Sequence, residues 1–171
     1  ELWGLTFTTV TFGSASFNYP KSALFSIEKG IIIGTKEFNF ELKLKFFDKY
    51  MRKGLCFNET SPSYDYYYCK NDKVSKEQIN YEEFPSLQFF SSAMNFTIEF
   101  DYKDLFIEKD GVMLFLVFFQ TIDYGDQHYW TFGLPFFKKY MPYFNMDRKM
   151  IGICEKENKQ DEPKNPKKSS I

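Results

Sequence analysis

Few side chains in this sequence of 171 residues are equipped for nucleophilic or metal chemistry. The single histidine, His128, follows Gly125-Asp126-Gln127, a stretch typical of a loop. A serine nucleophile such as Ser26 would need that histidine as its general base, and we interpret His128 instead as an exposed or hydrogen-bonded structural residue. One histidine and three scattered cysteines make no ligand cluster, so we expect no metal site and no cofactor.

The most specific motif lies near the end of the chain. It reads Trp130-Thr131-Phe132-Gly133, then Pro135-Phe136-Phe137-Lys138-Lys139-Tyr140, Phe144-Asn145-Met146-Asp147 and Ile151-Gly152, and Phe84-Pro85-Ser86-Leu87 adds a further match. On these residues the chain closely resembles the C-terminal lobe of a pepsin-like aspartic protease, over about residues 1–154. It departs from the family pattern at Thr131, at Leu134, where an acid is usual, and at Asn145.

The resemblance implies an all-β, pepsin-like single lobe with a few short helices. It also implies structural roles for Trp130, Gly133, Phe136, Tyr140 and Gly152. In this family a segment of two hydrophobic residues and a glycine packs behind the catalytic turn. Gly133 would permit that close approach, because glycine has no Cβ to clash.

The same resemblance predicts a catalytic aspartate directly after Ala23-Leu24-Phe25, in an Asp-Thr-Gly or Asp-Ser-Gly turn. Ser26 occupies that position and is followed by Ile27-Glu28. The chemistry needs two carboxylates about 3 Å apart that share one proton, and a serine hydroxyl has no proton to transfer near neutral or acidic pH. Glu28 is a nearby carboxylate, but we expect it to lie on the wrong side of the turn to replace the aspartate.

We therefore expect a pseudoenzyme: a catalytically inactive aspartic-protease-like lobe that acts as a binding or structural subunit of a larger secreted or luminal assembly. The alternative is one lobe of a processed, active aspartic endopeptidase whose acid comes from an unconventional position. A single lobe of this family exposes sheet edges and apolar surface. The expected partner is accordingly an N-terminal pepsin-like lobe or another protein subunit.

Charge and hydropathy exclude two classes of partner. The formal net charge of −1 gives no broad attraction to nucleic acid. The longest apolar run, Val112 to Phe119, has eight residues, whereas a membrane-spanning helix needs about 20. We expect no transmembrane segment, and we interpret this run as one buried strand.

Cysteines and sequons indicate the secretory pathway. A disulfide between Cys56 and Cys69 would close a polar, tyrosine-rich loop, although two buried free thiols fit the same spacing. Asn58-Glu59-Thr60 and Asn95-Phe96-Thr97 are acceptor sequons for N-glycosylation. Cys154 is left over, either buried or paired with another chain. Together these features favour a glycoprotein that is secreted, at the cell surface, or in the lysosomal or vacuolar lumen.

Local patterns predict the order of the elements. The first 20 residues alternate as a hairpin with a turn at Gly13-Ser14 and one slip in register near Thr8-Thr9, for which a bulge is one explanation. Residues 35–51 fit a helix capped by Thr35 and equally fit an alternating strand, and the family resemblance favours the helix. The loop tyrosines Tyr64, Tyr66, Tyr67 and Tyr68 could form a contact surface or could fold back on the lobe.

The second half of the chain is predicted to complete a sheet. Strands are expected at residues 84–90, 96–100, 112–119 and 129–132, with a short helix at residues 134–140. Residues 143–145 and 150–153 would finish the sheet across a turn at residues 147–149. Residues 155–171 are charged and almost free of apolar side chains, so we expect a polar tail after a lobe that spans residues 1–154.

Overall fold

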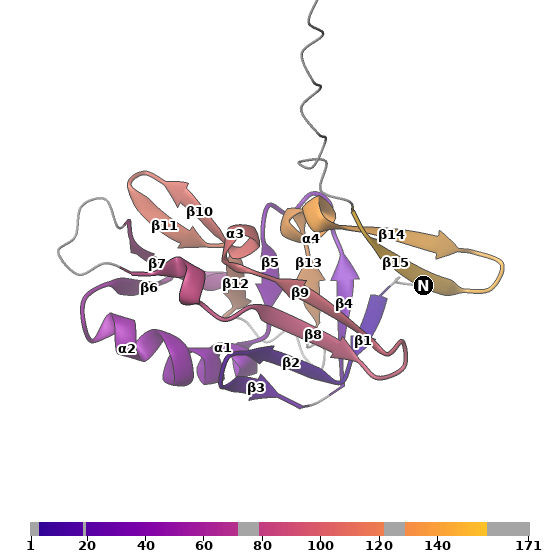
Figure 1. Ribbon diagram of the computed structural model, residues 1–171, viewed down its shortest axis with the longest axis horizontal. Helices are drawn as coiled ribbons and strands as arrows, with labels where there is room; N and C mark the ends of the chain where they lie inside the picture. Colours follow the sequence, from indigo (N-terminus) through magenta and orange to yellow (C-terminus); the bar gives the residue numbers. More distant parts are fainter. Residues whose placement is uncertain (1–3, 19, 72–78, 122–128, 157–171) are drawn as a thin grey trace, which may run out of the picture.

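The computed structural model describes residues 4–18, 20–71, 79–121 and 129–156, and strands dominate its regular structure (Figure 1). The architecture confirms the all-β class with a few short helices. The largest sheet has nine strands in the order β1-β4-β13-β5-β12-β7-β11-β10, with β6 paired to β7. Its strands are β1 (Gly4–Phe7), β4 (Lys21–Phe25), β5 (Ile32–Gly34), β6 (Cys56–Thr60), β7 (Tyr64–Lys70), β10 (Phe106–Lys109), β11 (Val112–Phe115), β12 (Val117–Gln120) and β13 (Trp130–Phe132).

A second sheet packs on the first and encloses the core. It has four antiparallel strands in the order β3-β2-β8-β9. They are β2 (Thr9–Phe12), β3 (Ala15–Phe17), β8 (Leu87–Ser91) and β9 (Phe96–Phe100). Between the sheets lie fully buried aromatic rings, among them Phe7, Phe89 and Phe132, whose centroids are 4.9 to 5.7 Å apart. The aromatic-rich composition is thus used mainly to fill the space between two sheets.

The break in alternation near Thr8 is a change of sheet, and the predicted simple bulge is wrong. β1 pairs with β4 in the large sheet, while β2 pairs with β3 and β8 in the small one. Thr8 lies between them and donates its backbone N–H to the Phe90 carbonyl at 2.8 Å. The turn at Gly13-Ser14 does connect β2 to β3, with Gly13 at a φ of 59°.

Residues 36–51 are helical, as the family resemblance favoured. α1 (Lys36–Leu42) is followed by a π-helical turn, η1 (Lys43–Phe47), and by α2 (Asp48–Met51). Thr35 caps α1, accepting the Phe38 N–H on its side-chain oxygen at 3.4 Å. The strand pattern fails because Phe40 and Leu44, which it would bury, are 63% and 52% exposed.

Two predictions about the later strands are wrong. The run of residues 112–119 is not one strand: it breaks at Leu116, so that β11 pairs with β10 and β7 while β12 pairs with β5 and β7. The last two strands, β14 (Tyr140–Asn145) and β15 (Met150–Glu155), do not finish the main sheet. They form a separate two-stranded hairpin, which follows α4 (Leu134–Lys139).

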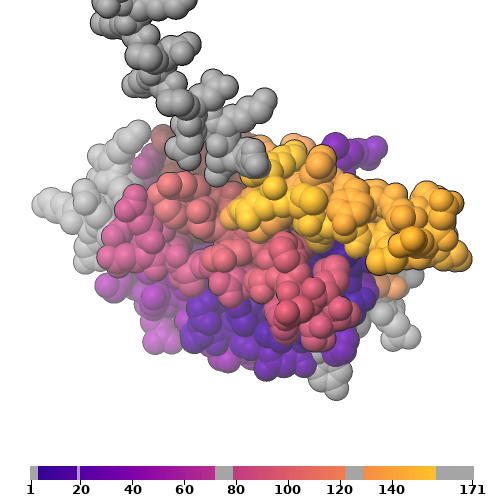
Figure 2. Space-filling model, turned by 45° about the vertical axis from the view of Figure 1, so that its right-hand side comes forward, coloured from indigo at the N-terminus to yellow at the C-terminus, as the bar shows by residue number. Residues whose placement is uncertain are grey.

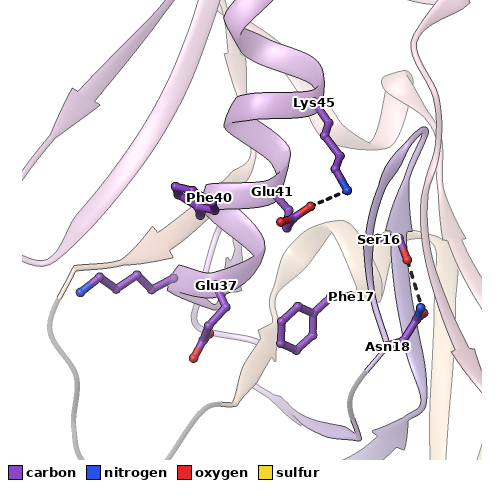
Figure 3. A pocket seen from close by; sticks show the side chains of 8 residues that line it. Ser16, Phe17, Asn18, Glu37, Phe40, Glu41 and Lys45 are labelled. Carbon is purple, nitrogen blue, oxygen red and sulfur yellow. Dashed lines mark hydrogen bonds and ion pairs between the residues drawn. The ribbon is translucent and has the colours of Figure 1, made fainter.

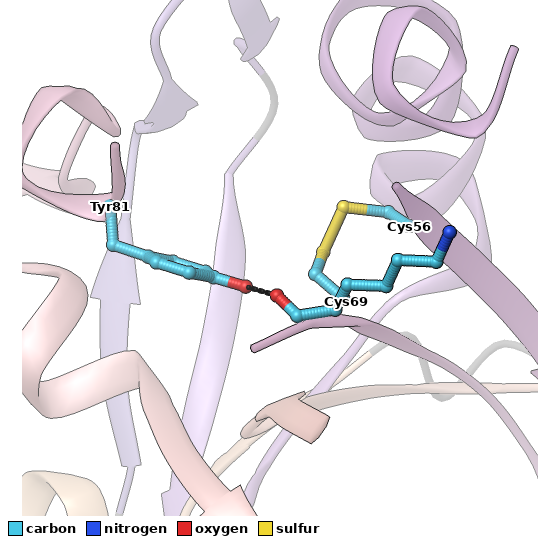
Figure 4. The surroundings of a disulfide bond; sticks show 4 residues. Cys56, Cys69 and Tyr81 are labelled. Atoms are coloured by element: carbon cyan, nitrogen blue, oxygen red, sulfur yellow. Dashed lines mark hydrogen bonds between the residues drawn. A yellow bond between two sulfur atoms is a disulfide. The ribbon is translucent and has the colours of Figure 1, made fainter. Parts of the chain in front are cut away.

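The tyrosine-rich stretch between Cys56 and Cys69 is a strand hairpin and not a loop. Cys56 and Cys69 are opposite one another in the β6–β7 register and form a disulfide (Figure 4). The Tyr81 hydroxyl, from the short 3₁₀ helix η2 (Tyr81–Glu83), donates to the Lys70 carbonyl beside the disulfide at 2.9 Å. Tyr67 is fully buried, so it belongs to the core and not to a contact surface.

Candidate functional site

The candidate site is the turn between β4 and β5, and β13 supports it from behind. β13 lies between the two strands, parallel to β4 and antiparallel to β5. The Ser26 backbone N–H donates to the Phe132 carbonyl at 2.9 Å, and the Leu134 N–H donates to the Lys29 carbonyl at 2.7 Å. Both ends of the turn are therefore tied to the crossing segment, which we define as residues 130–134.

Gly133 makes this crossing possible. A Cβ at this position would overlap the backbone carbonyl oxygens of Lys29 and Ile31. Every residue other than glycine carries that atom, so any substitution must push the turn away from the crossing segment. The turn and the crossing segment are in backbone contact at this residue.

Ser26 lies at the start of the turn, directly after β4, and is partly exposed. Its carbonyl accepts the Lys29 N–H at 3.2 Å, which closes a short turn. Ile27, Glu28, Lys29 and Gly30 all face solvent. The hydroxyl of Ser26 thus stands at the carboxyl end of β4, with an exposed carboxylate two residues further along the turn.

The remaining motif residues have packing roles. Trp130 is fully buried and meets the rings of Phe38 and Phe89 with centroids 5.3 and 4.8 Å away. Phe136 stacks on Phe132 at 5.0 Å. Gly152 lies opposite Tyr143 in the β14–β15 hairpin, and the tyrosine ring occupies the space that a Cβ would need.

Tyr140 covers the outer edge of β9. Its hydroxyl accepts the Glu99 N–H at 3.0 Å and donates to the Glu99 carbonyl at 3.1 Å. A side chain thereby satisfies backbone groups that a neighbouring strand would otherwise bind. Burial raises the pKa of the Tyr140 phenol, so the hydroxyl keeps its proton well into the alkaline range.

One polar network reaches the core near α1. The Tyr67 hydroxyl donates to the Asn39 amide oxygen at 2.8 Å, and the Asn39 amide donates to Asp65 at 3.2 Å. Burial raises the pKa of Tyr67 beyond that of ordinary tyrosines. Because its members are satisfied by one another, we assign this network to structure and not to catalysis.

The other chemical candidates form no common site among the described residues. His128 lies outside those residues. Among the described residues, histidine, cysteine and acidic side chains form no group of three that could hold a metal ion.

A shallow hollow between α1 and β3 is lined by residues of mixed character (Figure 3). Glu41 and Lys45 form an ion pair there at 2.6 Å, and Phe40 lies exposed beside them. Ser16 donates to the Asn18 side chain at 3.3 Å on the opposite side. The ion pair joins Glu41 to Lys45, and the labelled side chains do not converge on a common point (Figure 3).

The two sequons differ in setting. Asn95 is exposed in the β8–β9 turn with a φ of 46°, whereas Asn58 lies within β6 and donates its amide to the Tyr66 carbonyl at 3.2 Å. Cys154 is an exposed free thiol on β15, so the first of its two alternatives, burial, is wrong. In the described part of the chain, no helix is long and apolar enough to cross a membrane.

No known protein family and no curated protein matches this sequence. Among solved structures, 126 chains match the fold. One is the basic 7S globulin from soybean, with a TM-score of 0.65 and 14% sequence identity. The match covers 89% of this chain and 38% of the globulin, so this chain spans well under half of that protein. The globulin has a pepsin-like fold, and the described residues therefore form an all-β lobe of the pepsin-like type.

Proposed function

We propose that this chain is a catalytically inactive aspartic-protease-like lobe that serves as a binding or structural subunit. The main observation behind this proposal is that Ser26 follows β4, at the position where the pepsin-like resemblance requires an aspartate. The turn that begins at Ser26 still packs on Gly133 of the crossing segment. A hydroxyl cannot share a proton with a second carboxylate, so the general acid and base of the reaction are lost.

The neighbouring carboxylate does not repair this loss. Glu28 is exposed at the outer side of the turn, while the Ser26 N–H points at the Phe132 carbonyl on the β13 side. Moving Glu28 to the end of β4 would require rebuilding a turn whose two ends are fixed by hydrogen bonds to the crossing segment. These contacts support the loss of catalysis over the alternative of an active endopeptidase lobe.

The β14–β15 hairpin supports the existence of a protein partner. Figure 2 shows this hairpin in orange to yellow, extending beyond the rest of the lobe. We call the face that carries Met141 its outer face. Met141, Tyr143 and Met150 lie on this face and are 53%, 56% and 59% exposed. Among the described strands, β14 and β15 pair only with each other. Contiguous exposed apolar side chains with open strand edges are typical of an interaction surface.

We infer that this hairpin face binds an N-terminal pepsin-like lobe or another protein subunit. The globulin supports this inference, because the chain matches only 38% of that protein. The Cys56–Cys69 disulfide favours an oxidising compartment, such as the secretory lumen or the extracellular space. Asn95, in its exposed turn, is the sequon that we expect to carry a glycan.

The catalytic part of the proposal is tested on the complete assembly from its native source. Denatured protein is incubated with it at acidic pH, with and without a peptidic aspartic-protease inhibitor. We expect no inhibitor-sensitive cleavage. Cleavage that the inhibitor suppresses would show that the assembly is an active protease and would overturn the proposal.

The partner surface is tested separately by size-exclusion chromatography with light scattering. The double substitution Met141→Glu and Met150→Glu places charges on the hairpin face, and Met94→Glu is the matched control at an exposed methionine in the β8–β9 turn. We expect the native protein to elute above the monomer mass and the double variant to elute as a monomer. A native protein that is monomeric at all concentrations would contradict the partner role.

A further inference from the structure

The outer face of the sheet around β7 is unusually apolar. Strand alternation sends Tyr67 and Cys69 into the core, so Tyr64, Tyr66 and Tyr68 stand on the opposite face. An antiparallel sheet that packs on a core with one face normally carries polar side chains on the other. This face departs from that rule and carries aromatic rings instead, which indicates a binding surface.

The rings stand in two stacked pairs. Tyr66 stacks on Phe118 with centroids 4.7 Å apart and planes 12° from parallel, and Tyr68 stacks on Phe57 at 5.3 Å and 22°. The Tyr66 hydroxyl donates to the Glu59 carboxylate, which fixes the ring further. Two rigid aromatic ridges therefore stand side by side on one sheet face.

A hollow of about 530 Å³ lies against these ridges. Val112 and Leu114 line it, and Leu114 is the cross-strand neighbour of Tyr68. Glu59 and Asp110 contribute carboxylates to the lining, and Lys109 contributes one cation. The hollow combines an apolar, aromatic-lined surface with an excess of acidic groups at its margin.

We propose that this hollow binds the chain's own C-terminal segment Pro163-Lys164-Asn165-Pro166-Lys167-Lys168. Two prolines three residues apart favour a polyproline II conformation, and grooves lined by aromatic rings bind such segments. The three lysines of the segment complement the carboxylates of Glu59 and Asp110. The proposal concerns a separate face of the lobe and does not depend on the loss of catalysis.

A series of contacts links the start of the tail to the hollow. The Lys156 N–H donates to the Lys139 carbonyl at 2.8 Å. The Lys139 ammonium forms an ion pair with the Asp104 carboxylate at 3.1 Å. Asp104 lies in α3 (Tyr102–Leu105), which runs directly into β10 (Figure 1). Lys109, at the end of β10, lines the hollow. The path from Lys156 to the hollow combines the Lys139 contact, the Lys139–Asp104 ion pair and the length of β10, which is about 13 Å. The seven residues from Lys156 to Pro163 can span up to about 24 Å.

Limited trypsin digestion of the full-length folded chain tests the proposal. Lys164 lies inside the segment and Lys159 lies before it, so cleavage at Lys159 is the internal reference. A synthetic peptide of residues 155–171 calibrates the intrinsic rates of the two sites. We expect cleavage at Lys164 to be slowed at least about five-fold relative to Lys159, because the protease acts on the released tail.

Three variants identify the contact. Tyr66→Ser, which removes one ridge, and the double substitution Pro163→Ala and Pro166→Ala, which changes the C-terminal segment itself, should each abolish the protection at Lys164. Tyr102→Ser, at a partly exposed tyrosine outside the hollow, should leave it unchanged. Equal cleavage ratios in the wild type and in Tyr66→Ser would overturn the proposal. Protection that disappears on dilution would also overturn it, because a second copy would then supply the tail.

Discussion

The turn at residues 26–30 and the crossing segment beneath it follow opposite rules. In the turn, Ile27 is 66% exposed, and a Cβ added at Gly30 would meet no atom within 4 Å. In the crossing segment, Trp130 is fully buried and a Cβ added at Gly133 would collide with backbone. The lobe is therefore held together from behind the turn, and the chemistry of the turn can vary without disturbing the scaffold.

The strongest test of this difference between the two regions is to add one methyl group to each of them. Gly133→Ala should destabilise the lobe by about 4 kcal/mol or more, or prevent folding, because the new atom overlaps two backbone carbonyl oxygens that cannot rotate away. Gly30→Ala should change the free energy of unfolding by less than about 0.5 kcal/mol. Urea denaturation of both variants measures the difference. Similar stabilities would show that the turn and the crossing segment are not in backbone contact.

A second pair of substitutions compares side chains in the two regions. Trp130→Ala removes a ring that packs on Phe38 and Phe89, and it should cost about 3–5 kcal/mol. Ile27→Ala removes an exposed side chain and should stay within about 0.5 kcal/mol of the wild type. The same urea curves give both values. A large loss in the free energy of unfolding for Ile27→Ala would contradict the exposure of this side chain and would indicate that a partner buries it.

Alkaline pH tests two buried phenols of the scaffold outside the turn, Tyr67 and Tyr140. Burial raises the folded-state pKa of Tyr67 and of Tyr140, whereas the unfolded phenols titrate near 10. The stability that these groups contribute is complete below about pH 10 and is lost as pH rises toward the folded pKa, because only the unfolded chain ionises there.

The expected slope is up to about 1.4 kcal/mol per pH unit for each buried phenol. Tyr140→Phe should reduce the loss of stability between pH 10 and 11, and Tyr143→Phe, at an exposed tyrosine on the same hairpin, should leave it unchanged. Thermal unfolding at a series of pH values supplies the comparison. An identical pH dependence in all three proteins would contradict the assigned burial of Tyr140.

What the sequence could predict depends on whether local pattern or long-range pairing determines each feature. The strand at residues 130–132 follows from composition. The fold class follows from the resemblance around Trp130, and the same resemblance, not the local pattern, favoured the helix after Thr35. The break at Leu116 was not predictable, because an uninterrupted apolar run gives no sign that its two halves pair with different strands. The separate β14–β15 hairpin was not predictable for the same reason, because period-two alternation does not specify the strand with which a strand pairs.

The most direct test of the turn is a substitution with a small expected effect on stability. Ser26→Asp restores the acid that the pepsin-like resemblance calls for, at a partly exposed position whose backbone bonds to Phe132 and Lys29 remain available. We expect a change of less than about 1 kcal/mol in the free energy of unfolding, measured in urea. The isolated variant should not cleave denatured protein at acidic pH, because a single carboxylate has no second acid with which to share a proton.

The same variant in the complete assembly distinguishes the possible partners. If the partner is an N-terminal lobe that supplies its own aspartate, Ser26→Asp brings two carboxylates to one site, and inhibitor-sensitive cleavage should appear. If the partner is an unrelated subunit, the assembly should stay inactive with aspartate at position 26. Cleavage by the isolated variant would contradict both outcomes, because the lobe would then contain a second acid close to the end of β4.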